Sequence, residues 1–362
     1  MRGLAADFAL RAGSFSLEVH VEAGPGITVL FGPSGSGKSL TLRAIAGLTR
    51  PRSGRVTFDD TVLFDRSAGI DCPPHRRRLG FAGQHPALLP FLDVAGNVAF
   101  GLRGIPRAER ATRVRQWLER VGLPGFESRR VGTLSGGQAQ RIALARALAP
   151  GHRLLLLDEP FSALDESLRQ GLRAILRRLA TEQELTILFV THDLREAHLL
   201  ADQLVVLDGG TILQCGQRET VFRAPANRRV ALLLGAVNVF PGVVRARDGQ
   251  NLLVESHGLV LRARSSAGDP APGDPVDLTI RPERVIVRRS DPGINAFPAR
   301  VAEDLDYGAA HTLVFEPLAA GPRLTCELAA RPYDVLGIAA AGEWTIELPP
   351  EHLHVMPAAP PT

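Results

Sequence analysis

The stretch Gly32-Pro33-Ser34-Gly35-Ser36-Gly37-Lys38-Ser39 constrains the fold of this chain more than any other. It fits the pattern G-x-x-x-x-G-K-[ST], in which a tight glycine-rich bend lets backbone N–H groups surround a phosphate. The Lys38 ammonium can supply positive charge to the outer phosphates of a triphosphate, and the Ser39 hydroxyl can ligate Mg²⁺. The pattern therefore predicts a triphosphate site.

The residues on either side support this prediction. Residues 27–31 form a short apolar run that is typical of a buried strand, and residues 40–48 have the pattern of a helix. A helix that starts at Leu40 points its N-terminus and its partial positive charge at the phosphates. An ordinary glycine-rich turn is the alternative, and the flanking strand and helix make it the weaker one.

Composition limits the class of protein. A length of 362 residues predicts about two domains, and 45% hydrophobic content is ordinary for a globular protein. The net charge of +4 is spread over scattered arginines, which favours solvated surfaces over nucleic-acid binding. Cys72, Cys215 and Cys326 lie far apart, so we expect neither a disulfide framework nor a zinc site. No apolar run approaches the ~18 residues of a membrane span, so membrane association is expected to go through a partner.

Strands and helices alternate between residues 154 and 207, which predicts a parallel sheet covered by helices on both faces. The wholly apolar run 154–157 is followed by Asp158 and Glu159, and residues 185–190, which are predicted to form another buried strand, are soon followed by His192. Because ligands bind at the carboxyl ends of parallel strands, we expect these three side chains to lie near the phosphates.

Each of these side chains suits a different task. The Asp158 carboxylate is a ligand type that Mg²⁺ prefers, the Glu159 carboxylate can polarise an attacking water, and His192 can contact the γ-phosphate. The amide of Gln84 can hold water or the metal ion without adding a charge. A solvated acidic pair and a structural histidine are the alternatives, and the four leucines before Asp158 favour the functional interpretation.

A second glycine-rich turn, Ser135-Gly136-Gly137, opens into a helix and offers another anion site at a helix N-terminus. A single nucleotide held between two subunits would use both sites. Between the two turns, residues 93–122 are predicted to be helical, with Pro106 in a first turn and Gly122 as a C-terminal stop.

Helical patterns end near residue 235, and short β runs follow, so we place a domain boundary at about 236. Residues 237–244 are similar to residues 294–301, and residues 280–287 are similar to residues 348–355. Two landmarks in the same order predict two copies of one small β-barrel, at 236–290 and 291–356.

The order of motifs resembles that of the ATP-binding-cassette (ABC) ATPases over residues 1–235. The resemblance implies an α/β P-loop NTPase domain that binds ATP with Mg²⁺. It also implies a head-to-tail homodimer, with each ATP between the phosphate loop of one subunit and the signature sequence of the other. The motifs are the phosphate loop, Gln84, the signature Leu134-Ser135-Gly136-Gly137-Gln138, Asp158-Glu159, Ser162-Ala163-Leu164-Asp165 and His192.

By this resemblance, Gln84 lies in the loop that touches a membrane subunit, Asp165 lies in the dimer-contact loop and His192 is the switch histidine. Phe15 is the candidate for the aromatic ring that stacks on adenine. The chain departs from the family pattern at Ala82-Gly83, which is smaller than usual, and at Ala139, where a polar residue is common.

Residues 236–362 resemble the paired oligonucleotide-binding-like (OB-like) barrels of importer ATPases, which implies an all-β regulatory or dimerisation domain. The resemblance predicts the cytosolic ATPase subunit of a binding-protein-dependent importer at the cytoplasmic face of the inner membrane. Its partners would be an integral membrane permease and, indirectly, an external binding protein. Several features look most like the molybdate importer's ATPase subunit, so molybdate is the favoured cargo; they are residues 26–32, 47–51, 76–81 and 294–301. Ile280-Arg281-Pro282-Glu283 is common in other types, which leaves sulfate, ferric iron, polyamine and sugar open.

In the resembling molybdate systems a Ser-Ala-Arg-Asn run opens the barrel. Here Gly235-Ala236-Val237-Asn238 and Pro292-Gly293-Ile294-Asn295 keep the asparagine but have lost the serine hydroxyl and the arginine guanidinium. We therefore predict that the tail supports dimerisation and does not bind molybdate tightly.

Two other functions are weighed against this one. A non-transport ATPase of the same superfamily usually has two cassettes or a long coiled-coil insertion, and this chain has one phosphate loop and no such insertion. An oxyanion sensor would make the tail the working part, and the full set of nucleotide motifs argues against that as the sole role.

Overall fold

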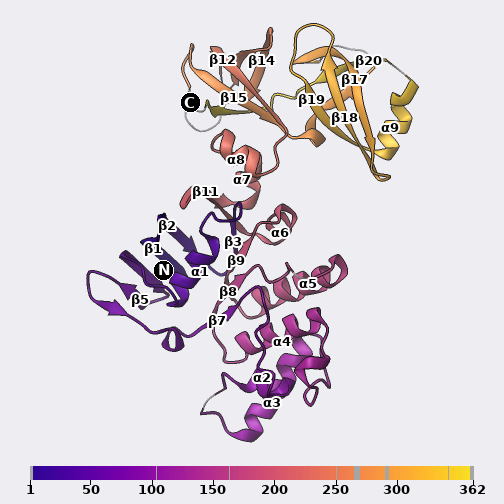
Figure 1. The fold of residues 1–362 in the computed structure, drawn as a ribbon. Helices are drawn as coiled ribbons and strands as arrows, with labels where there is room; N and C mark the ends of the chain where they lie inside the picture. The colour runs from indigo at the N-terminus through magenta and orange to yellow at the C-terminus, as the bar shows by residue number, and fades with distance from the viewer. Residues whose placement is uncertain are drawn as a thin grey trace. The chain divides into compact units, whose positions relative to one another are not determined.

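The computed structural model describes residues 3–102, 104–162, 164–249, 251–264, 270–289, 293–340 and 342–358. The motif residues Ala163 and Pro292 fall outside this described part. The chain divides into two compact units, Met1–Arg218 and Glu219–Thr362 (Figure 1). The sequence-based boundary near 236 marks the end of the helical pattern, whereas this division groups two short helices with the second unit.

A six-stranded sheet forms the centre of the first unit. Five neighbouring strands are parallel, in agreement with the alternating sequence pattern, and an antiparallel strand forms one edge. The run 154–157 is fully buried, which explains why it is wholly apolar. The strands lie in the order β11 (Thr211–Gln217), β10 (Gln203–Asp208), β3 (Gly26–Phe31), β9 (Thr186–Thr191), β8 (Leu154–Asp158) and β7 (Leu79–Ala82).

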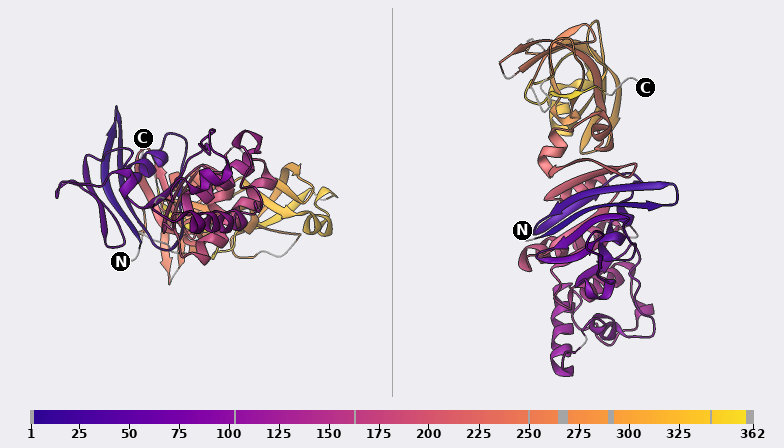
Figure 2. Two further views of the ribbon diagram at one scale, coloured as in Figure 1. Left: turned by 90° about the horizontal axis from the view of Figure 1, so that it is seen from below. Right: turned by 90° about the vertical axis from the view of Figure 1, so that its left-hand side faces the viewer.

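One face of this sheet shares a core with an antiparallel sheet and with α1 (Lys38–Ala46). The inner residues of the antiparallel strands alternate with exposed ones, which gives them the period of two that is visible in residues 15–21. Strands β1 and β2 form the long indigo ribbon in both views of Figure 2. The antiparallel sheet has the order β2 (Phe15–Ala23), β1 (Leu4–Ala12), β4 (Ser53–Phe58), β5 (Thr61–Asp65) and β6 (Ile70–Asp71).

Helices from the middle of the chain pack beside the sheet, where α5 and α6 lie against β3 and α4 lies against β7, whereas α2 and α3 pack against α4. The predicted helix over residues 93–122 is two helices, because the chain turns between Ala99 and Arg107. A Cβ at Gly101 would lie 2.8 Å from Pro150 Cγ, so the turn packs closely against the residues that follow α4. The helical segments are η1 (Pro74–Arg76), α2 (Val94–Ala99), α3 (Arg107–Arg120), η2 (Val131–Thr133), α4 (Gly136–Leu148), α5 (Glu166–Glu182) and α6 (Leu194–Leu200).

The second unit contains a closed barrel and a five-stranded sheet, which share one apolar core. The barrel has the order β12 (Asn238–Asp248), β13 (Asn251–Ser256), β14 (Leu259–Arg264), β21 (His354–Pro357) and β15 (Pro275–Ile280). The sheet has the order β16 (Ile286–Arg288), β20 (Glu343–Glu347), β17 (Ala296–Asp306), β18 (Ala310–Pro317) and β19 (Leu324–Ala329). Near them lie η3 (Pro282–Arg284), α9 (Ala330–Leu336) and η4 (Ile338–Ala340).

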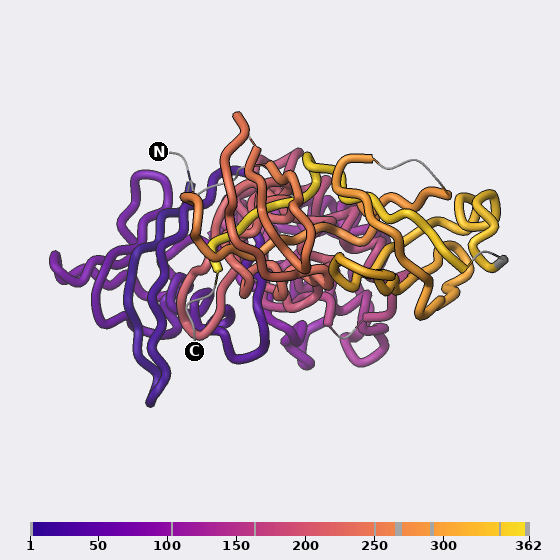
Figure 3. The backbone as a smooth tube through the Cα atoms, turned by 90° about the horizontal axis from the view of Figure 1, so that it is seen from above, coloured from indigo at the N-terminus to yellow at the C-terminus, as the bar shows by residue number. Residues whose placement is uncertain are grey.

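The two sequence copies exchange their last strands, which corrects the prediction of two separate barrels at 236–290 and 291–356. Strand β16 comes from the first copy and pairs with β20 of the second. Strand β21 comes from the second copy and completes the barrel of the first, where it appears in yellow among orange strands in Figure 3. Neither copy can therefore form its full set of strands alone.

The asparagine that both copies retain joins them. The Asn238 side chain exchanges two hydrogen bonds with the backbone of Thr325 in β19, each 2.7 Å long. The Asn295 side chain does the same with the backbone of Arg262 in β14, also at 2.7 Å, and donates to the carbonyl of Leu348. Each amide thus binds a strand that the other copy contributes.

Two short helices, α7 (Arg218–Arg223) and α8 (Arg228–Leu233), are bound to the barrel by polar contacts. The Arg281 guanidinium donates to the carbonyls of Leu234 and Phe222, at 2.9 and 3.1 Å. Arg228 forms an ion pair of 2.6 Å with the buried Asp277 of β15. These contacts explain why the helices belong to the second unit.

We expect Asn238→Ala to lower the free energy of unfolding of the second unit by about 2 kcal/mol, because it leaves two buried backbone groups unpaired. The chain has two tryptophans. Trp344 lies buried in the second unit, so its fluorescence in a Trp117→Phe background reports urea unfolding of that unit. Asn251→Ala, at the start of β13, is the matched control. A loss for Asn238→Ala no greater than that of the control would contradict the linking role.

Candidate nucleotide site

A cleft of about 590 Å³ opens where β7 and β8 end and α1 begins. Four side chains that the sequence assigned to nucleotide or metal line it together: Ser39, Gln84, Asp158 and Glu159. They come from three separate parts of the chain. Sequence reasoning did not assign the other lining residues, which are Arg43, Leu48, Thr49, Phe81, Gly83 and His85.

Strand register brings these residues to one edge. Phe31, the last residue before the phosphate loop, pairs with Thr191, the residue before His192. Asp158 pairs with Val190, and the Glu159 N–H donates to the Val190 carbonyl at 3.0 Å. Three loops therefore leave the sheet at the same level.

The phosphate loop requires its glycines. Gly35 and Gly37 have φ angles of 80° and 107°, in the region that side chains disfavour. A Cβ at Gly32 would lie 2.0 Å from the Leu207 carbonyl oxygen, so no larger residue fits there. The buried Ser36 hydroxyl has no hydrogen-bond partner in the described part of the chain, which leaves it available to a bound phosphate.

Lys38 is the only lysine in the chain. Its buried ammonium donates to the carbonyls of Gly32 and Pro33, each at 2.8 Å, and keeps its third hydrogen for another acceptor. Burial lowers the pKa of Lys38, while the charges of Glu159 and Asp158 act in the opposite direction. The group is thus a desolvated cation held inside the loop.

Ser39 and Asp158 form the pair expected of a magnesium site. The Ser39 hydroxyl donates to Asp158 Oδ1 at 2.7 Å. Burial raises the pKa of Asp158, and the charge of Glu159 adds to the rise, whereas the hydrogen bond from Ser39 opposes it. A hydroxyl and a carboxylate beside the Gln84 amide fit Mg²⁺, which prefers oxygen ligands.

Glu159 and His192 are paired, with Oε1 of the glutamate 3.0 Å from Nδ1 of the histidine. Glu159 has a φ angle of 46°, which is unusual for a residue other than glycine. The Ser162 hydroxyl donates to the Glu159 carbonyl at 3.0 Å and supports this turn. The turn redirects the Glu159 side chain from the strand direction toward the site.

Phe15, the predicted adenine partner, and Leu40, which the sequence assigned to ATP binding, lie next to the phosphate loop. A Cβ at Gly37 would lie 3.3 Å from the Phe15 ring, so that ring adjoins the phosphate loop. The half-buried Leu40 side chain packs against the core, and the Leu40 backbone N–H lies in the first turn of α1.

The signature residues Leu134–Gln138 do not line this cleft. Ser135 is the N-cap of α4, where its hydroxyl accepts from the Gln138 N–H, and the Gln138 side chain accepts from the Ser135 N–H. Asp165 caps α5 in the same way by accepting from the Leu168 N–H at 2.9 Å. The polar signature side chains thus serve the helix start.

Two arginines near the site escaped the sequence analysis. Arg43 lies four residues after Ser39 on α1, a spacing that places both on one face of the helix and would have revealed it. Arg77 is buried and donates to the carbonyls of Ala44 and Ile45 at the end of α1. Arg77 also donates to Asp71 Oδ1 at 3.3 Å, but its other acceptors are backbone carbonyls, which no motif marks.

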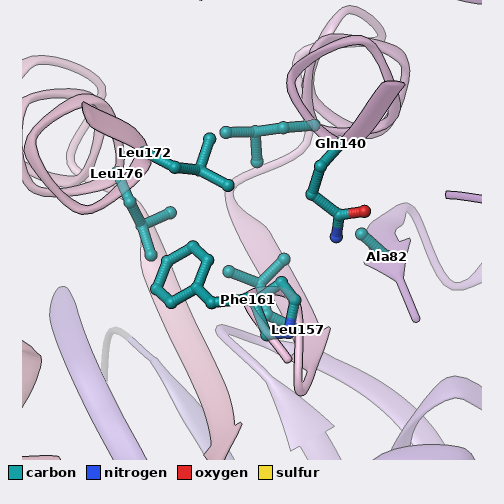
Figure 4. Close-up of a pocket in the computed structure, with 8 residues that line it drawn as sticks. Ala82, Gln140, Leu157, Phe161, Leu172 and Leu176 are labelled. Carbon is teal, nitrogen blue, oxygen red and sulfur yellow. The ribbon is translucent and has the colours of Figure 1, made fainter. Parts of the chain in front are cut away.

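A second, small cavity lies between α4, α5 and β8 (Figure 4). Leu157, Leu172, Leu176 and Phe161 line it, and the Gln140 amide lies beside Ala82. Its volume of about 10 Å³ is close to that of one water, so it belongs to the core and is no ligand site.

A parallel sheet with a phosphate loop, a Ser–Asp pair and a Glu–His pair at one edge defines a P-loop nucleoside-triphosphatase. The family model described as "ABC transporter" matches residues 16–162. The chain belongs to the ABC transporter family, as one of its importer-type ATPase subunits.

Three curated relatives show the family's range. A spermidine/putrescine import ATP-binding protein PotA of Roseobacter denitrificans is 42% identical over 77% of this chain and 76% of its own. A molybdenum import ATP-binding protein ModC of Paramagnetospirillum magneticum is 39% identical over 72% of each. An Fe(3+) ions import ATP-binding protein FbpC of Streptomyces avermitilis is 40% identical over 86% of each.

Among solved structures, the chain resembles the ATP-binding cassette MJ0796, described as a dimer in a post-hydrolysis state bound to ADP and Pi. The TM-score is 0.51 with 29% identity, and the match covers 60% of this chain and 99% of the other. The shared fold confirms the predicted ABC-type α/β class and agrees with ATP as the nucleotide.

Because Lys38 is the only lysine, acetic anhydride has two amine targets, Lys38 and the α-amino group of the chain. We expect ATP with Mg²⁺, at about ten times its dissociation constant, to slow Lys38 acetylation about tenfold by mass action. Peptide mass mapping measures it, with the α-amino group as internal control. Equal labelling of Lys38 with and without ATP would show that the ammonium does not face the phosphates.

A second prediction concerns the variant Lys38→Ala, which should lose ATP binding.

Proposed function

We propose that the cleft at the end of β7 and β8 hydrolyses ATP, with Glu159 as the residue that polarises the attacking water. The observation that carries this proposal is that Glu159 lines one cleft with the Ser39–Asp158 pair, while His192 Nδ1 lies 3.0 Å from Glu159 Oε1. His192 orients the Glu159 carboxylate in this arrangement and contacts the γ-phosphate. Gln84 reaches the same space with a neutral amide.

The remaining residues bind and neutralise. Backbone N–H groups of Gly32–Leu40 surround the phosphates, and Lys38 donates its third hydrogen to the outer ones. Ser39 and Asp158, with Gln84, would hold Mg²⁺, which screens the charge of the phosphates. The Phe15 ring beside Gly37 stacks on adenine.

We expect Glu159→Gln to bind ATP and to hydrolyse it about 10²–10⁴-fold more slowly, because the amide cannot accept a proton from water. With ATP it should accumulate as a dimer, measured by light scattering after gel filtration. Lys38 acetylation measures its ATP binding independently. Hydrolysis by Glu159→Gln at the parental rate would disprove the role of Glu159 as base.

We propose a head-to-tail homodimer in which Leu134–Gln138 of one subunit contacts the ATP of the other and Asp165 lies at the dimer contact. The position of the signature outside the subunit's own cleft supports this arrangement. No helix of the described residues is long and apolar enough to cross a membrane. On the similarity to import ATP-binding proteins, we propose that the chain sits at the cytoplasmic face of the inner membrane by binding a permease, which receives substrate from an external binding protein.

Gln84 is proposed to couple hydrolysis to the permease, since it is exposed at the mouth of the cleft. We expect Gln84→Ala to lower permease-stimulated ATPase activity about tenfold and basal activity much less. The measurement compares the purified subunit with the transporter reconstituted in vesicles. An equal loss of both activities would place Gln84 in the chemistry alone.

The cargo is proposed to be molybdate, on the sequence similarity to the molybdate importer's subunit. Polyamine, sulfate, ferric iron and sugar are the alternatives, and relatives named for polyamine, iron and sulfate match at an identity similar to or above that of the molybdenum relative. In the reconstituted transporter, stimulation by a binding protein loaded with molybdate, compared with the other cargoes, separates them.

The tail is proposed to support dimerisation and not to bind molybdate tightly. A tetrahedral dianion needs several donors at once, and the retained asparagines use their amides on the backbone of the other copy. Asn295 donates both of its hydrogens to carbonyls, which leaves none for an anion.

A further inference from the structure

The segment that follows Gln84 is gripped by an arginine from the signature helix. Arg146 of α4 donates through Nη1 to the Ala87 carbonyl at 2.7 Å and through Nη2 to the Pro86 carbonyl at 2.9 Å. The planar guanidinium presents parallel N–H groups, so it fits two successive carbonyls where an ammonium would not. Within the described part of the chain Arg146 has no carboxylate partner, so these carbonyls are its acceptors.

The gripped turn is strained. Ala87 has a φ angle of 44°, in the left-handed region that disfavours a residue with a Cβ. A turn of this kind persists only when surrounding contacts fix it, and Arg146 bonds to the strained residue itself. The Arg146 side chain is half-buried, and this burial lowers its pKa. Hydrogen bonds are stronger where water is partly excluded.

The far end of the segment is anchored separately. The Leu89 N–H donates to Asn97 Oδ1 at 2.8 Å, and Asn97 Nδ2 donates to the Leu89 carbonyl at 3.1 Å. Asn97 is fully buried in α2. Of these two anchors, Asn97 holds Leu89, and Arg146 holds the carbonyls of Pro86 and Ala87 between Gln84 and Leu89. Arg146 belongs to the helix that begins with the signature.

We propose that Arg146 is a positioning residue that makes the conformation of the Gln84 segment depend on the position of α4. The strained turn at Ala87 holds its shape while α4 keeps Arg146 in place and relaxes when the guanidinium withdraws. Contact of ATP with Gln84 and contact of the partner's ATP with the signature are thereby coupled. This coupling rests on the proposed roles of Gln84 and the signature, whereas the grip itself does not.

Hydrogen exchange of the full-length protein tests the grip. We expect Arg146→Ala to speed exchange in the peptide 84–92 about tenfold, since it removes two charge-assisted hydrogen bonds. Arg146→Lys, which reaches one carbonyl at a time, should give an intermediate rate. Arg141→Ala is the matched control on the same helix, because Arg141 forms no side-chain hydrogen bond within the described residues. An Arg146→Ala rate within twofold of the parent, or an equal increase in Arg141→Ala, would overturn the proposal.

A second variant tests the strain. Asparagine adopts the left-handed region more readily than alanine, and Ala87 is exposed, so Ala87→Asn should fit. We expect Ala87→Asn to restore part of the protection lost in Arg146→Ala and part of its ATPase kcat, with the ATP affinity of all variants unchanged. No rescue would contradict the strained-turn mechanism. Lys38 acetylation in the same variants tests nucleotide binding separately from the Arg146 hydrogen bonds. If ATP failed to slow Lys38 acetylation in the parent protein, that result would count against nucleotide binding and not against the role of Arg146.

Discussion

The parallel pairing of β3, β8 and β9 is the constraint on which the nucleotide site depends. Hydrogen bonding between β3 and β9 sets Phe31 opposite Thr191, and pairing of β8 with β9 sets Asp158 opposite Val190. A slip of one residue would turn every buried side chain of a strand to the other face of the sheet. Burial of both faces therefore fixes the register, and the register fixes the distance between phosphate loop, carboxylates and histidine.

This dependence explains how much the sequence could predict. Apolar runs that end in Asp158-Glu159 and before His192 identify strands whose carboxyl ends carry polar residues, and the parallel sheet brings them together as expected. The apolar pattern also predicted barrels in the tail. It could not predict that β16 and β21 exchange places, because a strand's own alternation is satisfied equally well in either sheet. The choice depends on the path of the chain, which periodicity does not record.

Arginine contacts with backbone carbonyls were also beyond sequence reasoning. Arg77 fixes the end of α1, Arg146 the segment after Gln84, and Arg281 the helices beside the barrel. These acceptors are carbonyls, which every residue has, so no partner residue type marks them, although Arg77 also donates to the Asp71 carboxylate at 3.3 Å. The one lysine of the chain, Lys38, lies in the phosphate loop. Its compact ammonium has three donors and can bond to the loop and to a phosphate at once.

Two of the residues with left-handed backbones lie at or near the cleft for a related reason. Glu159 and Ala87 both have left-handed backbones, and each has its carbonyl held by a neighbouring side chain, from Ser162 and Arg146 respectively. A strand that ended in relaxed extended geometry would continue past the sheet edge, whereas the left-handed residue turns the chain sharply there. Such turns cost about 1–3 kcal/mol each and must be offset by these bonds. The turn at Glu159 directs the carboxylate to His192, and the turn at Ala87 returns the chain toward α4, so each strained residue changes the chain's direction next to a functional side chain.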